Sequence, residues 1–188
     1  MDIFSSISEL PLLRGSLIDR PSLATLETLC TQARVETIIE VGTFLGMGST
    51  PTFYRALPPH GRLYCVDTFR VDMERYDRHQ DAHYHVFLSN IKQTGMADKV
   101  IPMRMTSLEA SRALNVTADL VFIDADHAES AVLADIAAWM ARVRPGGILC
   151  GDDYNTPSCP GVPLAVKRAL PQHQASGRIW WVRVESSR

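Results

Sequence analysis

A short apolar run, Thr37-Ile38-Ile39-Glu40-Val41, leads directly into the turn Gly42-Thr43-Phe44-Leu45-Gly46-Met47-Gly48-Ser49. The run has the length and the β-branched character of a buried strand. Glycines at its end let the backbone bend sharply and approach a ligand closely. A helix is predicted from this turn to about Ala56, where Pro58-Pro59 stops it. Strand, glycine turn and helix in this order predict the first unit of an α/β sheet.

The same alternation continues along the chain. Further strands are predicted at residues 62–66, 100–105, 119–123, 147–151 and 178–184, and helices over 22–34, from about 84 to Gly95, from about 108, over 132–143 and over 163–170. Repeated units of this kind predict a doubly wound, mostly parallel sheet with helices on both faces. No linker, low-complexity tract or repeat divides the chain, so residues 1–188 are predicted to be a single domain.

Composition and charge exclude several classes of protein. The chain has 188 residues, 46% of them hydrophobic and 21% charged, which suffices for one well-buried core. A net charge of −2 offers no broad basic surface for nucleic acid or a membrane. The apolar runs are strand-sized, and the first residues lack a signal-peptide pattern. No cysteines form a CxxC pair, and Cys65 and Cys150 fall in predicted strands, which favours reduced thiols in a cytoplasmic protein.

Three carboxylates follow two of the predicted strands. Asp124 ends the strand in Phe122-Ile123-Asp124-Ala125-Asp126-His127, and the pair Asp152-Asp153 follows the next one in Gly151-Asp152-Asp153-Tyr154. Neighbouring parallel strands end side by side, so residues 28 positions apart can meet there. Three converging carboxylates repel one another unless a cation lies between them, and Mg²⁺ prefers oxygen ligands. The pattern predicts a divalent-cation site.

Other candidate residues fall at the same ends of strands, where open α/β sheets bind their ligands. The glycines at positions 42, 46 and 48 do not form the dinucleotide fingerprint GxGxxG. Asp67 follows the second strand, and its carboxylate can accept two hydrogen bonds from ribose hydroxyls. The alternative is that the glycine turn is only a tight connection.

Taken in order, these motifs resemble a known family. They are Glu40-Val41-Gly42-Thr43-Phe44-x-Gly46, Val66-Asp67-Thr68-Phe69, Phe122-Ile123-Asp124-Ala125-Asp126-His127, Arg144-Pro145-Gly146-Gly147 and Gly151-Asp152-Asp153-Tyr154. The set resembles the class I S-adenosylmethionine-dependent methyltransferases. It is similar in particular to the metal-dependent O-methyltransferases of the catechol and caffeoyl-CoA type, and to the branch that methylates natural-product sugars and includes cephalosporin-hydroxylase-like proteins. The resemblance covers about residues 36–165 and implies a Rossmann-like sheet.

The resemblance implies a role for each matching residue. Glu40, Gly42, Thr43, Phe44 and Gly46 would shape the methionine end of the S-adenosylmethionine site, and Asp124 would border it. Asp67 would hold the ribose with Thr68 beside it, and Thr106 and Ser107 would lie near the adenine. Asp124, Asp152 and Asp153 would bind Mg²⁺ or another divalent cation, and His127 would be the catalytic base. The domain would comprise a helical segment (1–35), a cofactor-binding core (36–153) and a C-terminal helix and strand (154–188).

The implied reaction is Mg²⁺-dependent O-methylation of a small-molecule hydroxyl, either a phenol or catechol or a sugar of a natural product. A metal lowers the pKa of a bound hydroxyl, and a histidine with an ordinary pKa near 6.5 is suited to accept the proton. Two other classes stay open: a nucleotide-binding oxidoreductase on a similar sheet, and a non-catalytic protein that binds S-adenosylmethionine.

Structural explanations also exist for the candidate residues. Asp124 or, better placed, Asp126 could cap the next helix, and His127 could be an inert residue at its start. Asp152 and Asp153 could be solvated turn residues. His79, His83 and His85 suggest zinc, but their charged surroundings favour an exposed helix or lid segment. Trp180-Trp181 is expected to pack the last strand against the sheet.

The tail departs from the family pattern of a final antiparallel pair of strands, since only residues 178–184 read as a strand. We expect this last strand to be antiparallel. Either a short strand lies hidden between residues 155 and 177, which makes a sheet of seven strands, or the sheet has six. Little of the chain remains to cover an acceptor pocket. We expect residues 70–85, or the second subunit of a homodimer, to complete it.

Overall fold

A computed structural model describes residues 3–12, 18–70 and 82–185 of the chain. The strands are β1 (Thr37–Val41), β2 (Arg62–Asp67), β3 (Val100–Arg104), β4 (Ala118–Ile123), β5 (Val143–Gly151), β6 (Gln174–Ser176) and β7 (Ile179–Arg183). The helices are α1 (Arg20–Ala33), α2 (Thr50–Ala56), α3 (Ala82–Gln93), α4 (Ser107–Ala113), α5 (Glu129–Met140) and α6 (Gly161–Ala169). Strands and helices alternate as far as α6, as the sequence predicts.

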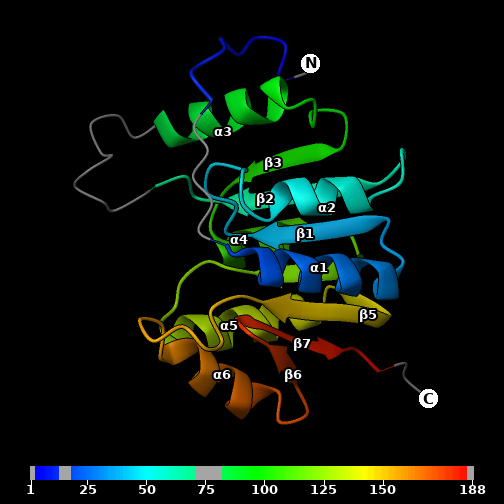
Figure 1. Cartoon of the computed structure of the whole chain (residues 1–188), viewed down its shortest axis with the longest axis vertical. Helices are drawn as coiled ribbons and strands as arrows, with labels where there is room; N and C mark the ends of the chain where they lie inside the picture. Colours follow the sequence, from blue (N-terminus) through cyan, green and yellow to red (C-terminus); the bar gives the residue numbers. More distant parts are fainter. Residues whose placement is uncertain (1–2, 13–17, 71–81, 186–188) are drawn as a thin grey trace.

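The described strands join one sheet in the order β3-β2-β1-β4-β5-β7-β6 (Figure 1). The five strands from β1 to β5 pair in parallel, β7 runs antiparallel to β5, and β6 runs antiparallel to β7. The predicted Rossmann-like, mostly parallel sheet with an antiparallel last strand is confirmed. The open choice between six and seven strands is settled at seven, because β6 lies in the interval where a hidden strand was considered.

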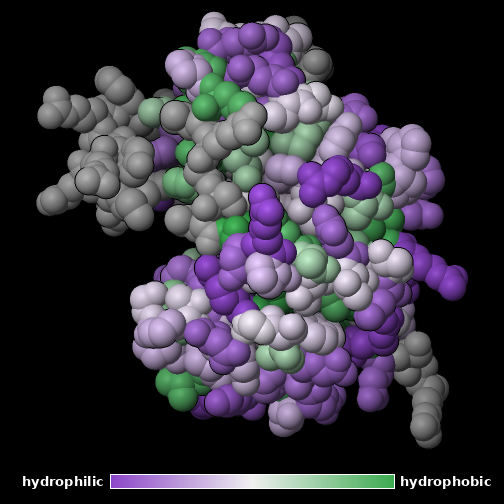
Figure 2. Space-filling model, in the orientation of Figure 1, coloured by the Kyte–Doolittle hydropathy of each residue, from purple (hydrophilic) through white to green (hydrophobic). Residues whose placement is uncertain are grey.

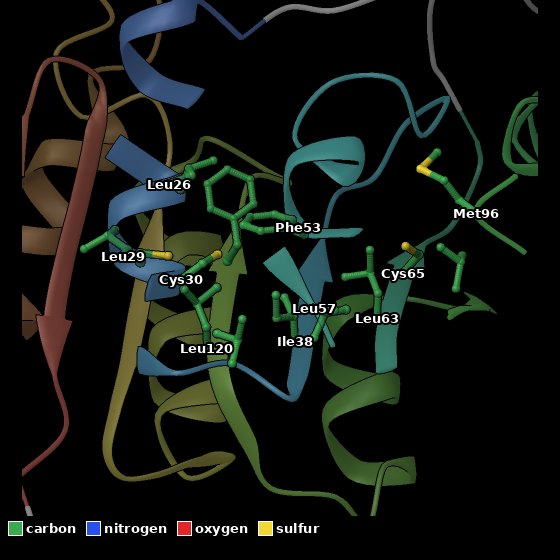
Figure 3. Packing of buried hydrophobic residues seen from close by; sticks show 14 of the residues in the cluster. Leu26, Leu29, Cys30, Ile38, Phe53, Leu57, Leu63, Cys65, Met96 and Leu120 are labelled. Carbon is green, nitrogen blue, oxygen red and sulfur yellow. The ribbon is translucent and has the colours of Figure 1, made fainter. Parts of the chain in front are cut away.

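Helices cover both faces of the sheet. Figure 1 shows α1 and α2 in front of the strands and α4 and α5 behind them. Neighbouring residues of one strand point to opposite faces, so Ile38 joins the apolar cluster under α1 to α3 while Ile39 joins the cluster under α4 to α6. Figure 3 shows side chains of α1 and α2, among them Leu26 and Phe53, packed with strand residues such as Leu120.

Three predicted boundaries are wrong: the start of the first helix, the end of the fifth helix and the start of the fifth strand. The first helix begins at Arg20 rather than at Ser22, because the side chain of Asp19 accepts a hydrogen bond from the backbone N–H of Ser22 (2.8 Å) and caps the helix. Val143 was assigned to the apolar face of the fifth helix, but that helix ends at Met140. Val143 instead begins β5 and pairs with Ala118. Its apolar side chain is buried in either setting, so periodicity alone misplaces it.

The surface and the cysteines agree with the composition. Figure 2 shows hydrophilic residues over most of one face, with apolar residues in small separate patches. The four cysteines, Cys30, Cys65, Cys150 and Cys159, are buried free thiols. Among the residues that the structure describes, no helix is long and apolar enough to cross a membrane.

Candidate functional site

The glycine turn (residues 42–49) brings the ends of three strands together. Gly42 has a φ of 91°, and a Cβ atom built on it would lie 1.8 Å from the carbonyl oxygen of Asp124. Its N–H donates to the carbonyl of Val66 (2.8 Å), and the N–H of Asp124 donates to the carbonyl of Val41 (2.8 Å). Only glycine allows this close approach, so the sequence of the turn places the ends of β1, β2 and β4 side by side.

Asp67 organises the turn through backbone donors. One carboxylate oxygen accepts from the N–H of Phe44 (2.8 Å) and the other from the N–H of Phe69 (2.7 Å). Both phenylalanines have a positive φ, 49° and 54°. Burial raises the pKa of Asp67, whereas these hydrogen bonds favour its ionised form. The carboxylate keeps acceptor capacity beyond these bonds, as hydrogen bonding to a ribose hydroxyl would require.

Glu40 lies beneath the turn and is fully buried. Its carboxylate accepts hydrogen bonds from the Ser49 hydroxyl and from Thr50 Oγ1 (2.8 Å), which join the end of β1 to the start of α2. Burial raises the pKa of Glu40 to about 7, although these donors oppose the shift. Nearby, Thr43 Oγ1 is buried without a hydrogen-bond partner among the described residues, so a polar group is available at the turn.

The residues predicted near the adenine form hydrogen bonds within the protein. Thr106 caps α4 and exchanges hydrogen bonds with Glu109 in a capping box. The Ser107 hydroxyl donates to Asp135 and accepts from Trp139 Nε1 (2.8 Å). Thr68 Oγ1 accepts from the N–H of Arg70 (3.3 Å). These contacts hold the loops after β2 and β3, and the cofactor roles of the three residues stay predictions.

The three carboxylates converge at the ends of β4 and β5. One oxygen each of Asp124, Asp152 and Asp153 lies within 4.8 Å of the others, and we call these residues the acidic cluster. Ile123 pairs with Gly151, which places the residues that follow them side by side. Asp152 and Asp153 are buried, so their interpretation as solvated turn residues is wrong. Burial and the two neighbouring charges raise the pKa of Asp124 to about 8.

Arg178 completes the acidic cluster, and the sequence analysis missed it. Its Nε and one terminal nitrogen bind the two oxygens of Asp152 (3.1 and 2.6 Å), and the same terminal nitrogen binds Asp153 (2.7 Å). Arg178 lies at the turn between β6 and β7. Because β7 is antiparallel to β5, it begins where β5 ends. The sequence contained a signal for Arg178, because it is the first residue of the last predicted strand and so lies at one end of the sheet.

His127 contacts the same cluster. Its Nε2 lies 2.9 Å from the second oxygen of Asp153. This contact raises the pKa of His127 and, with Arg178, holds the pKa of Asp153 down at about 2. His127 is therefore bound to the cluster rather than an inert helix-start residue. Asp126 accepts from the N–H of Ala128 (2.8 Å) in the turn before α5. The prediction that it caps this helix is wrong, because the N-cap residue is Ala128 and no side chain caps the helix.

Comparison with known proteins identifies the family. A model of a family described as a methyltransferase domain matches residues 39–154. The chain belongs to this methyltransferase family. The match contains both the glycine turn and the acidic cluster. The resemblance to class I S-adenosylmethionine-dependent methyltransferases, drawn from the motifs, is confirmed.

Solved structures share the fold of the methyltransferase. An O-methyltransferase from Bacillus cereus, solved with SAH, is 21% identical with a TM-score of 0.68, over 88% of this chain and 82% of that one. The O-methyltransferase TomG from Streptomyces achromogenes, solved with SAM, is 21% identical with a TM-score of 0.66, over 94% and 84%. No curated protein matches the chain.

One histidine of the methyltransferase was misjudged from its sequence. His83 was expected on an exposed segment, but it is buried, and its ring centroid lies 6.4 Å from that of Phe44. It also favours the ionised form of Asp67, so α3 brings it to the glycine turn. Its apolar neighbours on α3 bury that face of the helix. His85 is exposed as expected, and His79 and most of the proposed cover, residues 71–81, lie outside the described residues.

A narrow pocket of the methyltransferase opens beside the acidic cluster. It is lined by Ile123, Asp124, Ala125, Asp126, His127, Val132, Asp152, Val162 and Trp180. The Trp180 ring is fully buried, as the packing prediction required, while Trp181 is partly exposed. The Trp180 indole N–H has no hydrogen-bond partner among the described residues.

The acidic cluster fits a hard divalent cation. Its donors are all carboxylate oxygens, and their spacing lets one ion touch all three residues. Asp124, Asp152 and Asp153 are the residues that would hold it. Arg178 and His127 contact two of them already, so an ion would have to share their oxygens or displace those contacts.

Proposed function

We propose that this methyltransferase transfers a methyl group from S-adenosylmethionine to a hydroxyl oxygen of a small molecule, with a divalent cation at the acidic cluster. One observation carries the proposal. The glycine turn and the acidic cluster meet at Gly42, which lies directly against the backbone of Asp124. A donor bound by the turn and an acceptor bound by the cluster would therefore be neighbours, and methyl transfer depends mainly on such positioning.

The turn and Asp67 are the proposed binding elements for the donor. Its sulfonium supplies an activated methyl group. Asp67 would accept hydrogen bonds from the ribose, and Thr43 Oγ1 offers a hydroxyl that lacks a partner within the described protein. Glu40 supports the turn from below through Ser49 and Thr50, because it is buried away from the surface. Its proposed role is to position the turn.

The acidic cluster and His127 are the proposed elements for the acceptor. A divalent cation would lower the pKa of a hydroxyl bound to it. His127 lies at the rim of the cluster, with Nε2 held by Asp153. When that nitrogen carries the proton, Nδ1 is the atom that can accept one from the acceptor. Asp153 would thus orient the imidazole as well as contribute to the cluster.

The solved relatives support the choice of donor and reaction. The Bacillus cereus and Streptomyces achromogenes proteins are O-methyltransferases in complex with SAH and SAM. This chain covers more than four fifths of each of them. A phenol, a catechol and a natural-product sugar are all acceptors that the proposed chemistry would serve. Closure of the acceptor pocket by a second subunit, and a cytoplasmic location, stay predictions.

Calorimetric titration with S-adenosylhomocysteine, with and without Mg²⁺, tests the proposal. We expect binding in both conditions, and Mg²⁺-dependent release of S-adenosylhomocysteine from S-adenosylmethionine with a panel of catechols and sugar hydroxyls. Absence of cofactor binding at high protein concentration would refute the methyltransferase function. Binding of NADPH in a parallel fluorescence titration would favour the oxidoreductase alternative instead. Cofactor binding with catalysis that is indifferent to chelators would remove only the cation.

A further inference from the structure

Arg178 is held at the acidic cluster by more than its own side chain. The backbone N–H of Tyr154 donates to the carbonyl of Arg178 (2.9 Å), and the side chain of Asn155 donates to the carbonyl of Gly177 (2.6 Å). Gly151 pairs with Trp180 in the sheet. The turn between β6 and β7 is therefore docked on the residues that follow the two aspartates.

The contacts of Arg178 differ from those of a surface ion pair. Its guanidinium reaches three carboxylate oxygens at 3.1 Å or less, and its side chain is only 26% exposed. By contrast, Arg168 meets Glu129 at 3.5 Å with 73% of its side chain exposed. A planar guanidinium that binds one carboxylate through two nitrogens is a strong and directional partner. Arg178 is therefore a fixed part of the cluster.

The charges explain why such a residue is useful there. Three ionised carboxylates carry one more negative charge than a divalent cation can neutralise. Arg178 supplies the remaining positive charge through its contacts with Asp152 and Asp153. Without an ion, it is also the guanidinium that keeps two buried carboxylates satisfied.

We propose that Arg178 is the built-in cation of the acidic cluster, which stabilises Asp152 and Asp153 in the metal-free protein and competes with a divalent cation for their oxygens. This inference rests on the cation site of the proposed function. It makes Arg178 a positioning residue that sets the metal affinity. Its removal should leave the cluster more negative, so that a divalent cation binds more tightly and the fold comes to depend on it.

The test uses Mn²⁺ as the probe and compares wild type, Arg178→Gln and the control Arg183→Gln. Arg183 ends β7, the strand that follows Arg178, but it is exposed and binds the carbonyl of Gly146. Mn²⁺ affinity is measured by calorimetry, and thermal unfolding is followed with EDTA and with Mn²⁺. We expect Arg178→Gln to melt lower than wild type in EDTA, to be stabilised more by Mn²⁺, and to bind Mn²⁺ about tenfold more tightly, which corresponds to about 1.4 kcal/mol. Arg183→Gln should match wild type in each measurement.

The other possible results either support or overturn the proposal. Equal or weaker Mn²⁺ affinity of Arg178→Gln would overturn the proposal. If that variant folds only with Mn²⁺, the proposal is supported. If it does not fold at all, Arg178→Met, which also removes the positive charge, takes its place, and an affinity no tighter than that of wild type overturns the proposal. If neither wild type nor any of the variants binds Mn²⁺, both this inference and the proposed cation site are refuted. Titration of the same samples with S-adenosylhomocysteine then shows whether the proposed methyltransferase function holds without a cation site.

Discussion

The ends of β1 and β2 and the ends of β4 and β5 form two halves of one edge of the sheet, and they hold their carboxylates in different ways. Asp67 in the first half is bound by backbone N–H groups of Phe44 and Phe69. Asp152 and Asp153 in the second half are bound by the side chains of His127 and Arg178. Backbone donors cannot leave without unfolding the turn, whereas side chains can move away and give up their place to a metal ion. The first half therefore suits a fixed recognition site, and the second suits an ion and a reacting group.

The largest expected effect comes from breaking the contact between the halves. Gly42→Ala would place a Cβ atom on the carbonyl of Asp124, at a φ of 91°. We expect a loss of more than about 4 kcal/mol in the free energy of unfolding, or no folded protein. Gly95→Ala is the control, because Gly95 also has a positive φ but nothing lies within 4 Å of the added atom. It should cost only about 1 kcal/mol in urea denaturation. Equal effects would show that the close approach is unimportant.

The second half alone is tested by His127→Ala. Loss of a base lowers the rate constant of the chemical step. For a hydroxyl compound that the wild-type enzyme methylates, we expect kcat to fall about 100-fold or more. The affinity for S-adenosylhomocysteine should not change, since His127 contacts the acidic cluster and not the turn. His60→Ala, at an exposed position beside Glu36, is the control. A normal rate for His127→Ala would remove His127 from the mechanism.

The first half alone is tested by Asp67→Asn. The amide has one oxygen, so one of the N–H groups of Phe44 and Phe69 loses its acceptor. We expect the affinity for S-adenosylhomocysteine to fall about tenfold and stability to fall by about 1–3 kcal/mol, while Mn²⁺ affinity stays unchanged. Asp98→Asn, where an exposed carboxylate meets Tyr54, serves as the control in calorimetry. A parallel loss of Mn²⁺ affinity would mean that the halves are not independent.

The smallest effect concerns Glu40 and appears as a dependence on pH. Its folded pKa of about 7 lies above the ordinary value of 4.5. Between these values the folded state keeps a proton that the unfolded state has released, so stability falls as the pH rises through this window. Glu40→Gln should abolish this contribution, which is on the order of 1 kcal/mol per pH unit. Denaturation at several pH values measures this contribution. Glu36→Gln is the control, because Glu36 is an exposed acid directly before the same strand. Identical pH profiles of wild type and Glu40→Gln would contradict it.

The predictable parts of the site are those in which one segment contains all the information. The glycine turn, Asp67 and the acids after β4 and β5 follow directly from short strands and their terminal residues. Their meeting at one edge follows from parallel pairing, which the βα alternation implies. The three-residue strand β6 was not assigned, because all of its residues are exposed and it has no apolar pattern. His83 was misjudged because its neighbours in the sequence are charged.

From the chain alone came the α/β fold, the motifs of the methyltransferase family and the convergence of Asp124, Asp152 and Asp153. These follow from local physics, since the length and polarity of each run select a strand or a helix and place its last residues at a known edge. The partner of those acids, Arg178, depended on the antiparallel pairing of β7 with β5. Which strand lies beside which, and in what direction, results from burial of the whole sheet. The residues around Arg178 in the sequence do not indicate that it binds the acidic cluster. The balance of charge in the cluster is therefore decided by the tertiary structure.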